Sequence, residues 1–283
     1  MVELNDKRIA RPGEGDSVPA VVARPNSPLL TTKDGAAQRV SSAVFGESVE
    51  VFAKEGDFGL VRHGHDHYVG WSKLADLGAA PEQAFTHWVS SAMTHAFSKP
   101  DLKSAPKTAL FLGSRLIISE VDGAYHFMDG IGWLHEAQIL PMDQVYSDPS
   151  GVALGFLGSP YLWGGRDAFG LDCSGLTQQA FAACGIRLPR DSDMQFAWSG
   201  VALENWAESG ALQRGDLIFW RGHVGMMLDD VTLLHANAYT MRVSTEPLQT
   251  AIERIDQHTP YGRPIGAKRI DLDRTGEPDW FAE

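Results

Sequence analysis

The chain has 283 residues, 43% of them hydrophobic and 21% charged, which is the composition of a globular protein with two or three domains. Its formal net charge of −12 excludes a nucleic-acid or anionic-membrane partner, because both need a basic surface that no stretch of this sequence supplies. No apolar run follows a basic start, and none reaches the roughly 18 residues of a membrane helix. We therefore expect neither a signal peptide nor a membrane span.

The chain contains only two cysteines, Cys173 and Cys184, so a disulfide framework is excluded. On one helix they would lie roughly 16 Å apart along the axis, at about 1.5 Å per residue. That distance exceeds the Cα separation of about 7 Å that a disulfide tolerates. Two unpaired thiols suit a reducing compartment, and we expect a cytoplasmic protein.

The first half of the chain has the pattern of small all-β domains. Residues 1 to about 25 are rich in Pro, Gly and Ser and predict an extended arm. Between Leu29 and Leu77, short alternating runs are separated by turn signals, which predicts a compact β unit. We expect the arm and this unit to form a first domain over residues 1–78.

The β pattern then occurs a second time. The sequence from Leu112 to Ile118 matches that from Phe45 to Val51, and Gly70-Trp71 recurs as Gly132-Trp133, at a spacing of roughly 60 residues. Paired Gly-Trp motifs at this spacing resemble bacterial SH3-like repeats. We therefore expect a second barrel over residues 79–141, followed by a linker and a third domain over residues 150–272.

The run from His63 to His67 contains three histidines at alternate positions, which could converge on a metal from one face of a strand. The run falls where a hairpin loop of the first barrel is expected, and no cysteine or further carboxylate at ligand spacing supports it. We assign no metal and no cofactor to the chain.

The third domain begins with a helix that carries a cysteine at its start. Asp172 is a candidate N-cap, Leu176, Ala180 and Ala183 recur at helical spacing, and Gly185 is a candidate stop. The helix N-terminus should favour the thiolate form of Cys173 and make it a nucleophile. The alternative is a small buried core cysteine. Downstream, we expect a short helix after Leu188-Pro189-Arg190, and then strands at 217–220, 222–228 and 231–236.

A nucleophilic cysteine needs a base, and the base needs a group that orients it. His223 and His235 are the candidates, on two strands that a hairpin would join. An odd-length loop, such as Asp229 to Val231, gives paired residue numbers an even sum and puts both rings on one face of the sheet. A two-residue turn would put them on opposite faces.

Several spaced motifs over the last 120 or so residues resemble the NlpC-type cysteine peptidases, which cut bacterial cell-wall peptides. The resemblance implies a papain-like α+β domain behind the two all-β SH3-like barrels, an α+β chain overall. The residues that carry it are Tyr161 to Gly165, Asp172 to Gly175, Leu188 to Ser192 with Gln195, Gly215 to Phe219, Gly222 to Gly225, and His235.

The resemblance also implies a role for each matching residue. Cys173 would be the nucleophile, His223 the general base and acid, and His235 the orienting group. The Cys173 N–H and the Tyr161 hydroxyl would stabilise the oxyanion. Further residues would bind substrate: Asp191, with Glu47 and Tyr68 of the first barrel, at the free amine of the peptide; Ser174, Arg190 and Ser192 at the α-carboxylate of D-glutamate; and Asp172 at the pocket wall.

These roles imply an endopeptidase for the bond between γ-D-glutamate and diaminopimelate or lysine in free murein peptides with an unblocked L-alanine. Its only expected partner is that peptide, and the oligomeric state and the preferred diamino acid are not predicted. Three alternatives are open: a hydrolase or amidase of polymeric wall with wall-binding barrels, a non-catalytic binding module, and a papain-like acyltransferase.

Overall fold

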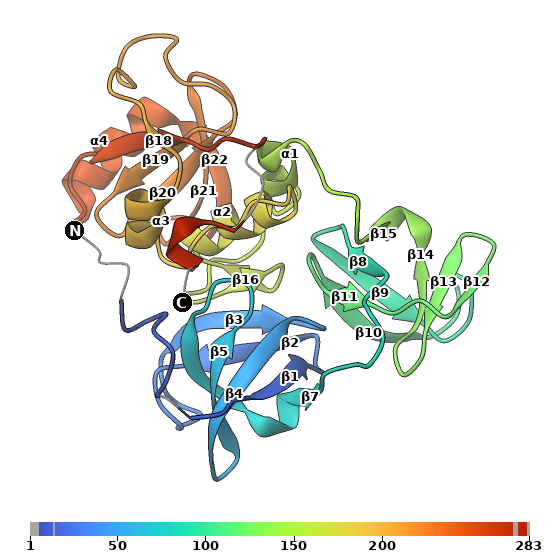
Figure 1. The fold of residues 1–283 in the computed structure, drawn as a ribbon. Coiled ribbons are helices and arrows are strands. Elements are labelled where there is room, and N and C mark those ends of the chain that lie inside the picture. Colours follow the sequence, from blue (N-terminus) through green and yellow to red (C-terminus); the bar gives the residue numbers. More distant parts are fainter. Residues whose placement is uncertain (1–5, 14, 274–276, 282–283) are drawn as a thin grey trace. The chain divides into compact units, whose positions relative to one another are not determined.

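The computed structural model describes residues 6–13, 15–273 and 277–281. The chain forms two compact units, an N-terminal unit from Lys7 to Val145 and a C-terminal unit from Tyr146 onward (Figure 1). The N-terminal unit consists of strands joined by turns, whereas the C-terminal unit combines a sheet with helices. No helix in these described parts is both long and apolar enough to cross a membrane.

The first barrel is a seven-stranded antiparallel sheet with the strand order β3-β2-β6-β5-β4-β1-β7. Its core is a cluster of small and branched side chains that includes Val22, Leu29 and Val61. Its strands are β1 (Val18–Val22), β2 (Asn26–Leu30), β3 (Arg39–Val44), β4 (Ser48–Glu55), β5 (Phe58–His63), β6 (Val69–Lys73) and β7 (Leu77–Ala79).

The second barrel consists of a five-stranded sheet, β10-β9-β14-β13-β12, and a three-stranded sheet, β11-β8-β15. Its core is a separate cluster that includes Val89, Leu110 and Leu134. Its strands are β8 (His87–Val89), β9 (Met93–Phe97), β10 (Pro106–Phe111), β11 (Arg115–Leu116), β12 (Glu120–Asp122), β13 (Tyr125–Met128), β14 (Gly132–His135) and β15 (Ile139–Pro141).

The two barrels repeat the same local geometry. Gly46 and Gly113 both have positive φ, at 78° and 85°, and each donates its N–H to the carbonyl of the first core valine, Val22 or Val89. Each barrel ends in a strand, a short 3-10 turn and a last short strand, with the turns η1 at Leu74–Asp76 and η2 at Glu136–Gln138. The expected all-β SH3-like region is confirmed, whereas the domain borders inside it stay predictions.

The expected N-terminal arm is in part wrong, because residues 18–22 form strand β1 inside the first sheet. The strand pairs with β4 on one side and with β7 on the other. Pro19 is tolerated because the β7 ladder begins only at Ala20, so no N–H is needed from Pro19 on that side. The alternation of Ala20 and Val22 into the core is too short to stand out in a Pro-rich stretch.

The C-terminal unit is built on a six-stranded antiparallel sheet with the order β18-β23-β19-β20-β21-β22. A separate two-stranded hairpin, β16-β17, comes before α2. The strands are β16 (Arg166–Asp167), β17 (Gly170–Leu171), β18 (Val201–Ala202), β19 (Leu217–Trp220), β20 (His223–Met227), β21 (Thr232–Asn237), β22 (Arg242–Pro247) and β23 (Gly266–Arg269); the helices are α1 (Pro149–Leu154), α2 (Cys173–Ala182), α3 (Ser192–Trp198) and α4 (Leu248–His258), and a 3-10 turn, η3 (Asp279–Phe281), follows.

Two helices of this unit have different environments. Every residue of α2 from Cys173 to Phe181 is buried, and the helix packs on β20 and β21. The amphipathic α4 buries Leu248, Ala251, Ile252 and Ile255, and these side chains join a core cluster with Trp220 and Leu233. The α+β fold expected from the sequence is confirmed, and its central helix presents Cys173 to the middle of the sheet.

Candidate active site

Cys173 lies at the first position of α2, directly after the N-cap Asp172. The Asp172 side chain accepts a hydrogen bond of 2.7 Å from the Gly175 N–H, as a capping residue does. The helix start packs closely on the preceding glycine-rich turn. A Cβ on Gly175 would lie 2.2 Å from the Gly165 carbonyl oxygen, so only glycine fits there.

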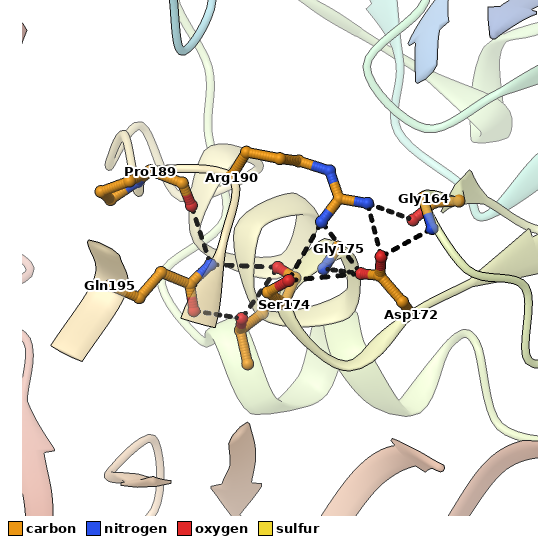
Figure 2. Close-up of polar contacts among 9 residues, drawn as sticks. Gly164, Asp172, Ser174, Gly175, Pro189, Arg190 and Gln195 are labelled. Carbon is orange, nitrogen blue, oxygen red and sulfur yellow. Dashed lines mark hydrogen bonds and ion pairs between the residues drawn. The ribbon is translucent and has the colours of Figure 1, made fainter. Parts of the chain in front are cut away.

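The Asp172 carboxylate also binds Arg190 and the turn. Arg190 donates to both carboxylate oxygens, at 3.0 and 2.7 Å, and to the Ser174 hydroxyl at 3.0 Å (Figure 2). The Gly164 N–H adds a bond of 2.8 Å to the same carboxylate. Three separate segments therefore converge on one buried charge.

Gln195 of α3 fixes the segment that carries Arg190. Its side-chain amide donates to the Ser174 carbonyl at 3.1 Å and to the Pro189 carbonyl at 2.9 Å (Figure 2). The Thr177 hydroxyl donates to its oxygen at 2.8 Å. A glutamine that satisfies both of its polar ends within the chain has a structural role.

Taken alone, the sequence Arg190-Asp191 would predict an exposed ion pair at a helix start. The structure contradicts this prediction, since Arg190 is fully buried and pairs with Asp172. Its contact with a substrate carboxylate stays a prediction, as does that of Ser174, which Arg190 binds. Asp191 lies half-buried at the N-cap position of α3, and Ser192 is the first residue of that helix.

The two histidines lie on one face of the sheet. The register pairs Met226 with Leu234 and Met227 with Leu233, so the loop has the odd length that this placement requires. His223 Nε2 and His235 Nδ1 are 2.9 Å apart, and both rings are buried. The expected side-by-side geometry of the histidines is confirmed.

The thiol lies beside β20, the strand that carries His223. The N–H groups of Ser174 and of Val224, which directly follows His223, donate toward the Cys173 sulfur. The contact between α2 and β20 therefore brings the thiol to the strand that carries the proposed base.

The expected thiolate is not what the structure favours. Burial raises the pKa of Cys173 to about 12, and the Asp172 charge adds to this effect, although the Val224 N–H, Arg190 and the Ser174 N–H oppose it. Burial also lowers the pKa of His223 well below its usual value, with further lowering by His235 and Arg254. At neutral pH the site therefore holds a thiol and a neutral imidazole.

Tyr161 is half-buried near the same charges. Burial, followed by Cys173 and Asp172, raises the pKa of its phenol, so the hydroxyl keeps its proton and can donate a hydrogen bond. The Cys173 N–H belongs to the first turn of α2, where the helix itself supplies no acceptor. Both groups have the donor chemistry that an oxyanion needs.

Three residues near the histidines were not found from the sequence. Glu246 of β22 lies with its Oε1 2.8 Å from His235 Nε2, and Arg254 of α4 binds the same carboxylate. The Tyr261 ring stacks on His223 at 6.5 Å between centroids. A prediction of β22 would have indicated Glu246, because it lies two residues from Ser244, the cross-strand partner of His235.

The barrel residues Glu47 and Tyr68 lie in the N-terminal unit, around the histidine loop. His63 is buried between Glu47, at 3.1 Å, and Asp66, at 3.0 Å, and Asp66 also accepts the Tyr68 N–H. Burial alone would lower the pKa of His63, but the two carboxylates outweigh it and raise that pKa. Among the residues that the structure describes, no group of three or more His, Cys, Asp and Glu is arranged for a metal ion.

The helix presents a buried cysteine against a strand that carries a histidine, and this histidine is hydrogen-bonded to a second one. This is the arrangement of a papain-like cysteine peptidase. Comparison with known families agrees with this class. Residues 158–258 match the NlpC/P60 family, and residues 29–77 match the bacterial dipeptidyl-peptidase SH3 domain. The chain carries an NlpC/P60 family domain preceded by a bacterial SH3 domain.

Two relatives are named gamma-D-glutamyl-L-lysine dipeptidyl-peptidase. The protein from Bacillus cereus is 40% identical over 103 residues, covering 34% of this chain and 29% of its own length. The one from Bacillus subtilis is 29% identical over 217 residues, covering 69% of this chain and 71% of its own. The match to the Bacillus cereus protein spans less than a third of that protein's length.

Solved structures support the fold. The crystal structure of an NlpC/P60 family protein from Bacillus cereus has a TM-score of 0.73 at 22% identity and covers 89% of this chain and 99% of that one. An NlpC/P60 endopeptidase from Photobacterium damselae subsp. piscicida has a TM-score of 0.62 at 14% identity, covering 95% of this chain and 76% of that one.

The Arg190–Asp172 pair generates a first prediction. Arg190→Met leaves a buried carboxylate without its cation, and we expect the opening free energy of α2 to fall by about 3–5 kcal/mol. Native-state hydrogen exchange of the α2 amides measures it. Arg187→Met is the control, since Arg187 forms a partly exposed pair with Glu277 and should cost about 1 kcal/mol or less. Equal effects of both changes would contradict the conclusion that the buried Arg190–Asp172 pair holds α2 in place.

A second prediction concerns protonation. Since burial lowers the pKa of His223 and carboxylates raise that of His63, His223 should stay neutral on acidification from pH 8 to pH 6 while His63 becomes protonated above pH 6.5. NMR titration of the imidazole resonances measures both. Protonation of His223 above pH 6.5 would contradict a neutral base.

Proposed function

We propose that this protein is a cysteine peptidase that hydrolyses the bond between γ-D-glutamate and a diamino acid in free murein peptides, releasing L-Ala-γ-D-Glu. The observation that carries the proposal is the hydrogen-bonded pair His223–His235 on β20 and β21, the two strands on which α2 packs with the buried Cys173 at its start. The family of the catalytic domain and the names of two relatives support the substrate class.

In this mechanism His223 takes the Cys173 proton as the sulfur attacks the γ-carbonyl carbon. Because the resting pair is neutral, proton transfer and attack occur together and no charge has to be buried beforehand. The carbonyl oxygen becomes an oxyanion, which the Cys173 N–H and the Tyr161 hydroxyl stabilise.

Collapse of the tetrahedral intermediate breaks the carbon–nitrogen bond. His223 gives its proton to the leaving amine of the diamino acid, and a thioester between Cys173 and the γ-carbonyl remains. Water then attacks the thioester with His223 as base, which frees L-Ala-γ-D-Glu and restores the thiol.

Substrate selection depends on the two ends of the released dipeptide. We assign the free amine of L-alanine to Asp191, with Glu47 and Tyr68 of the first barrel. The α-carboxylate of D-glutamate is assigned to Ser174, Arg190 and Ser192, with Asp172 at the pocket wall. A pocket for a free amine limits the enzyme to released fragments, since in intact wall that end is joined to sugar.

The same limit favours a role in recycling of murein peptides inside the cell. Both cysteines of the chain are free and buried, which suits a reducing compartment. We therefore propose a cytoplasmic enzyme.

The test is cleavage of L-Ala-γ-D-Glu-diaminopimelate and its lysine analogue, each with and without N-acetylation. We expect cleavage of the free peptides only, and a loss of about 10⁴-fold or more in the Cys173→Ala variant. Cys184→Ala is the matched control, because it removes the other buried thiol and should leave the rate unchanged.

Each contrary outcome has a specific meaning. Equal cleavage of acetylated peptides would overturn the free-amine pocket, and cleavage by the Cys173→Ala variant would overturn the nucleophile. Release of peptide from insoluble sacculi would favour a hydrolase of polymeric wall. No cleavage of any substrate would favour a binding module.

A further inference from the structure

A continuous chain of polar contacts runs from the catalytic strand to α4. His223 Nε2 is 2.9 Å from His235 Nδ1, and His235 Nε2 is 2.8 Å from the Oε1 atom of Glu246. His235 is completely buried, so its two ring nitrogens can form hydrogen bonds only with groups of the protein. The tautomer of each ring is therefore determined by its neighbour in this series of hydrogen bonds.

The carboxylate at the end sets the direction of every hydrogen bond. An ionised carboxylate can only accept, so His235 Nε2 must carry the proton. In a neutral ring His235 Nδ1 is then an acceptor, and it takes the proton of His223 Nε2. His223 Nδ1 is left with a lone pair, and it is the one ring nitrogen available to receive the Cys173 proton.

The Glu246 carboxyl group is itself kept ionised, so that it can only accept hydrogen bonds. Arg254 binds both of its oxygens from α4, and the Arg254 guanidinium also lies over the Tyr239 ring, 4.5 Å from its centroid. Burial opposes ionisation of Glu246, but hydrogen bonds from His235 and Arg254 outweigh it and keep the pKa of Glu246 below its usual value. The Arg254 side chain is 13% exposed and the Glu246 side chain 19% exposed, so the cation lies beside a largely buried carboxylate and holds it in place.

We propose that Glu246, anchored by Arg254, is a positioning residue that fixes the tautomers of His235 and His223 and thereby leaves His223 Nδ1 free to act as base. The inference rests on the proposed peptidase function, in which His223 accepts the Cys173 proton. It extends the Cys-His-His set by a carboxylate and an arginine from the next strand and helix.

The test is Glu246→Leu in the full-length protein, because glutamine can keep an oxygen at the position of Oε1, which accepts from both His235 and Arg254. Leucine removes that acceptor, so the His235 proton is no longer held on Nε2 and a proton can occupy His223 Nδ1. We expect kcat to fall by about 10- to 100-fold with KM within about twofold, as for other residues that orient a catalytic imidazole. Glu246→Asp keeps a carboxylate and should restore the tautomers.

The matched control is Glu253→Leu, which removes the same charge from an exposed position on α4, where the Glu253 carboxylate accepts from the Gln249 side chain. It should leave kcat and both tautomers unchanged. A fall in kcat equal to that of Glu246→Leu would overturn the proposal, because it would make the effect one of net charge.

Nitrogen-15 NMR of the histidine rings reads the tautomers without substrate, so this test is independent of the proposed reaction. The wild-type protein should show protonated Nε2 and unprotonated Nδ1 in both rings, and Glu246→Leu should show protonated Nδ1 in both rings in a measurable fraction of the molecules. If no peptide is cleaved but the pattern and its change are seen, the peptidase function fails and the positioning role stands. A protonated Nδ1 on wild-type His235, or unchanged tautomers in Glu246→Leu, would overturn the role of Glu246.

Discussion

The carboxylate of Asp172 accepts hydrogen bonds from three segments of the chain, and the position of Cys173 depends on it. The Gly164 N–H comes from the glycine-rich turn, the Gly175 N–H from the helix and the guanidinium from Arg190 (Figure 2). Because the group is buried and charged, losing any of these donors leaves part of a costly charge unsatisfied. The start of α2 is thus held by contacts that do not involve His223 or His235.

This anchoring affects the chemistry. Burial of the thiol and, after it, the negative charge of Asp172 raise the pKa of Cys173, so the helix N-terminus alone does not produce a thiolate. The sheet supplies what the helix cannot: a neutral His223, oriented by His235 and, through it, by Glu246. The same burial that keeps the thiol protonated keeps the base unprotonated. In the proposed reaction the developing charge is on the substrate oxygen, toward which the Cys173 N–H and the Tyr161 hydroxyl donate.

The sequence indicated those features that depend on local signals. The Asp172 cap and the repeat of the barrels follow from short patterns of residues whose geometry is set by their neighbours. The length of the loop after β20 was left open between an odd loop and a two-residue turn, and only the register of the strands decides it. Features set by distant contacts were missed or misread. Arg190 reads as exposed until its partner Asp172 is known, and Glu246 has no local signal because its role depends on the pairing of β21 with β22. Desolvation of Cys173 likewise depends on packing that no local pattern reports.

The most direct measurement of the central claim is mass spectrometry of the peptide that contains Cys173, after acid quench within the first turnover of L-Ala-γ-D-Glu-diaminopimelate. The account predicts a mass increase of one L-Ala-γ-D-Glu acyl group on Cys173, formed as the diamino acid is released and lost on hydrolysis. Release of the diamino acid with Cys173 unmodified at every quench time, or with the acyl group on another residue, would contradict it.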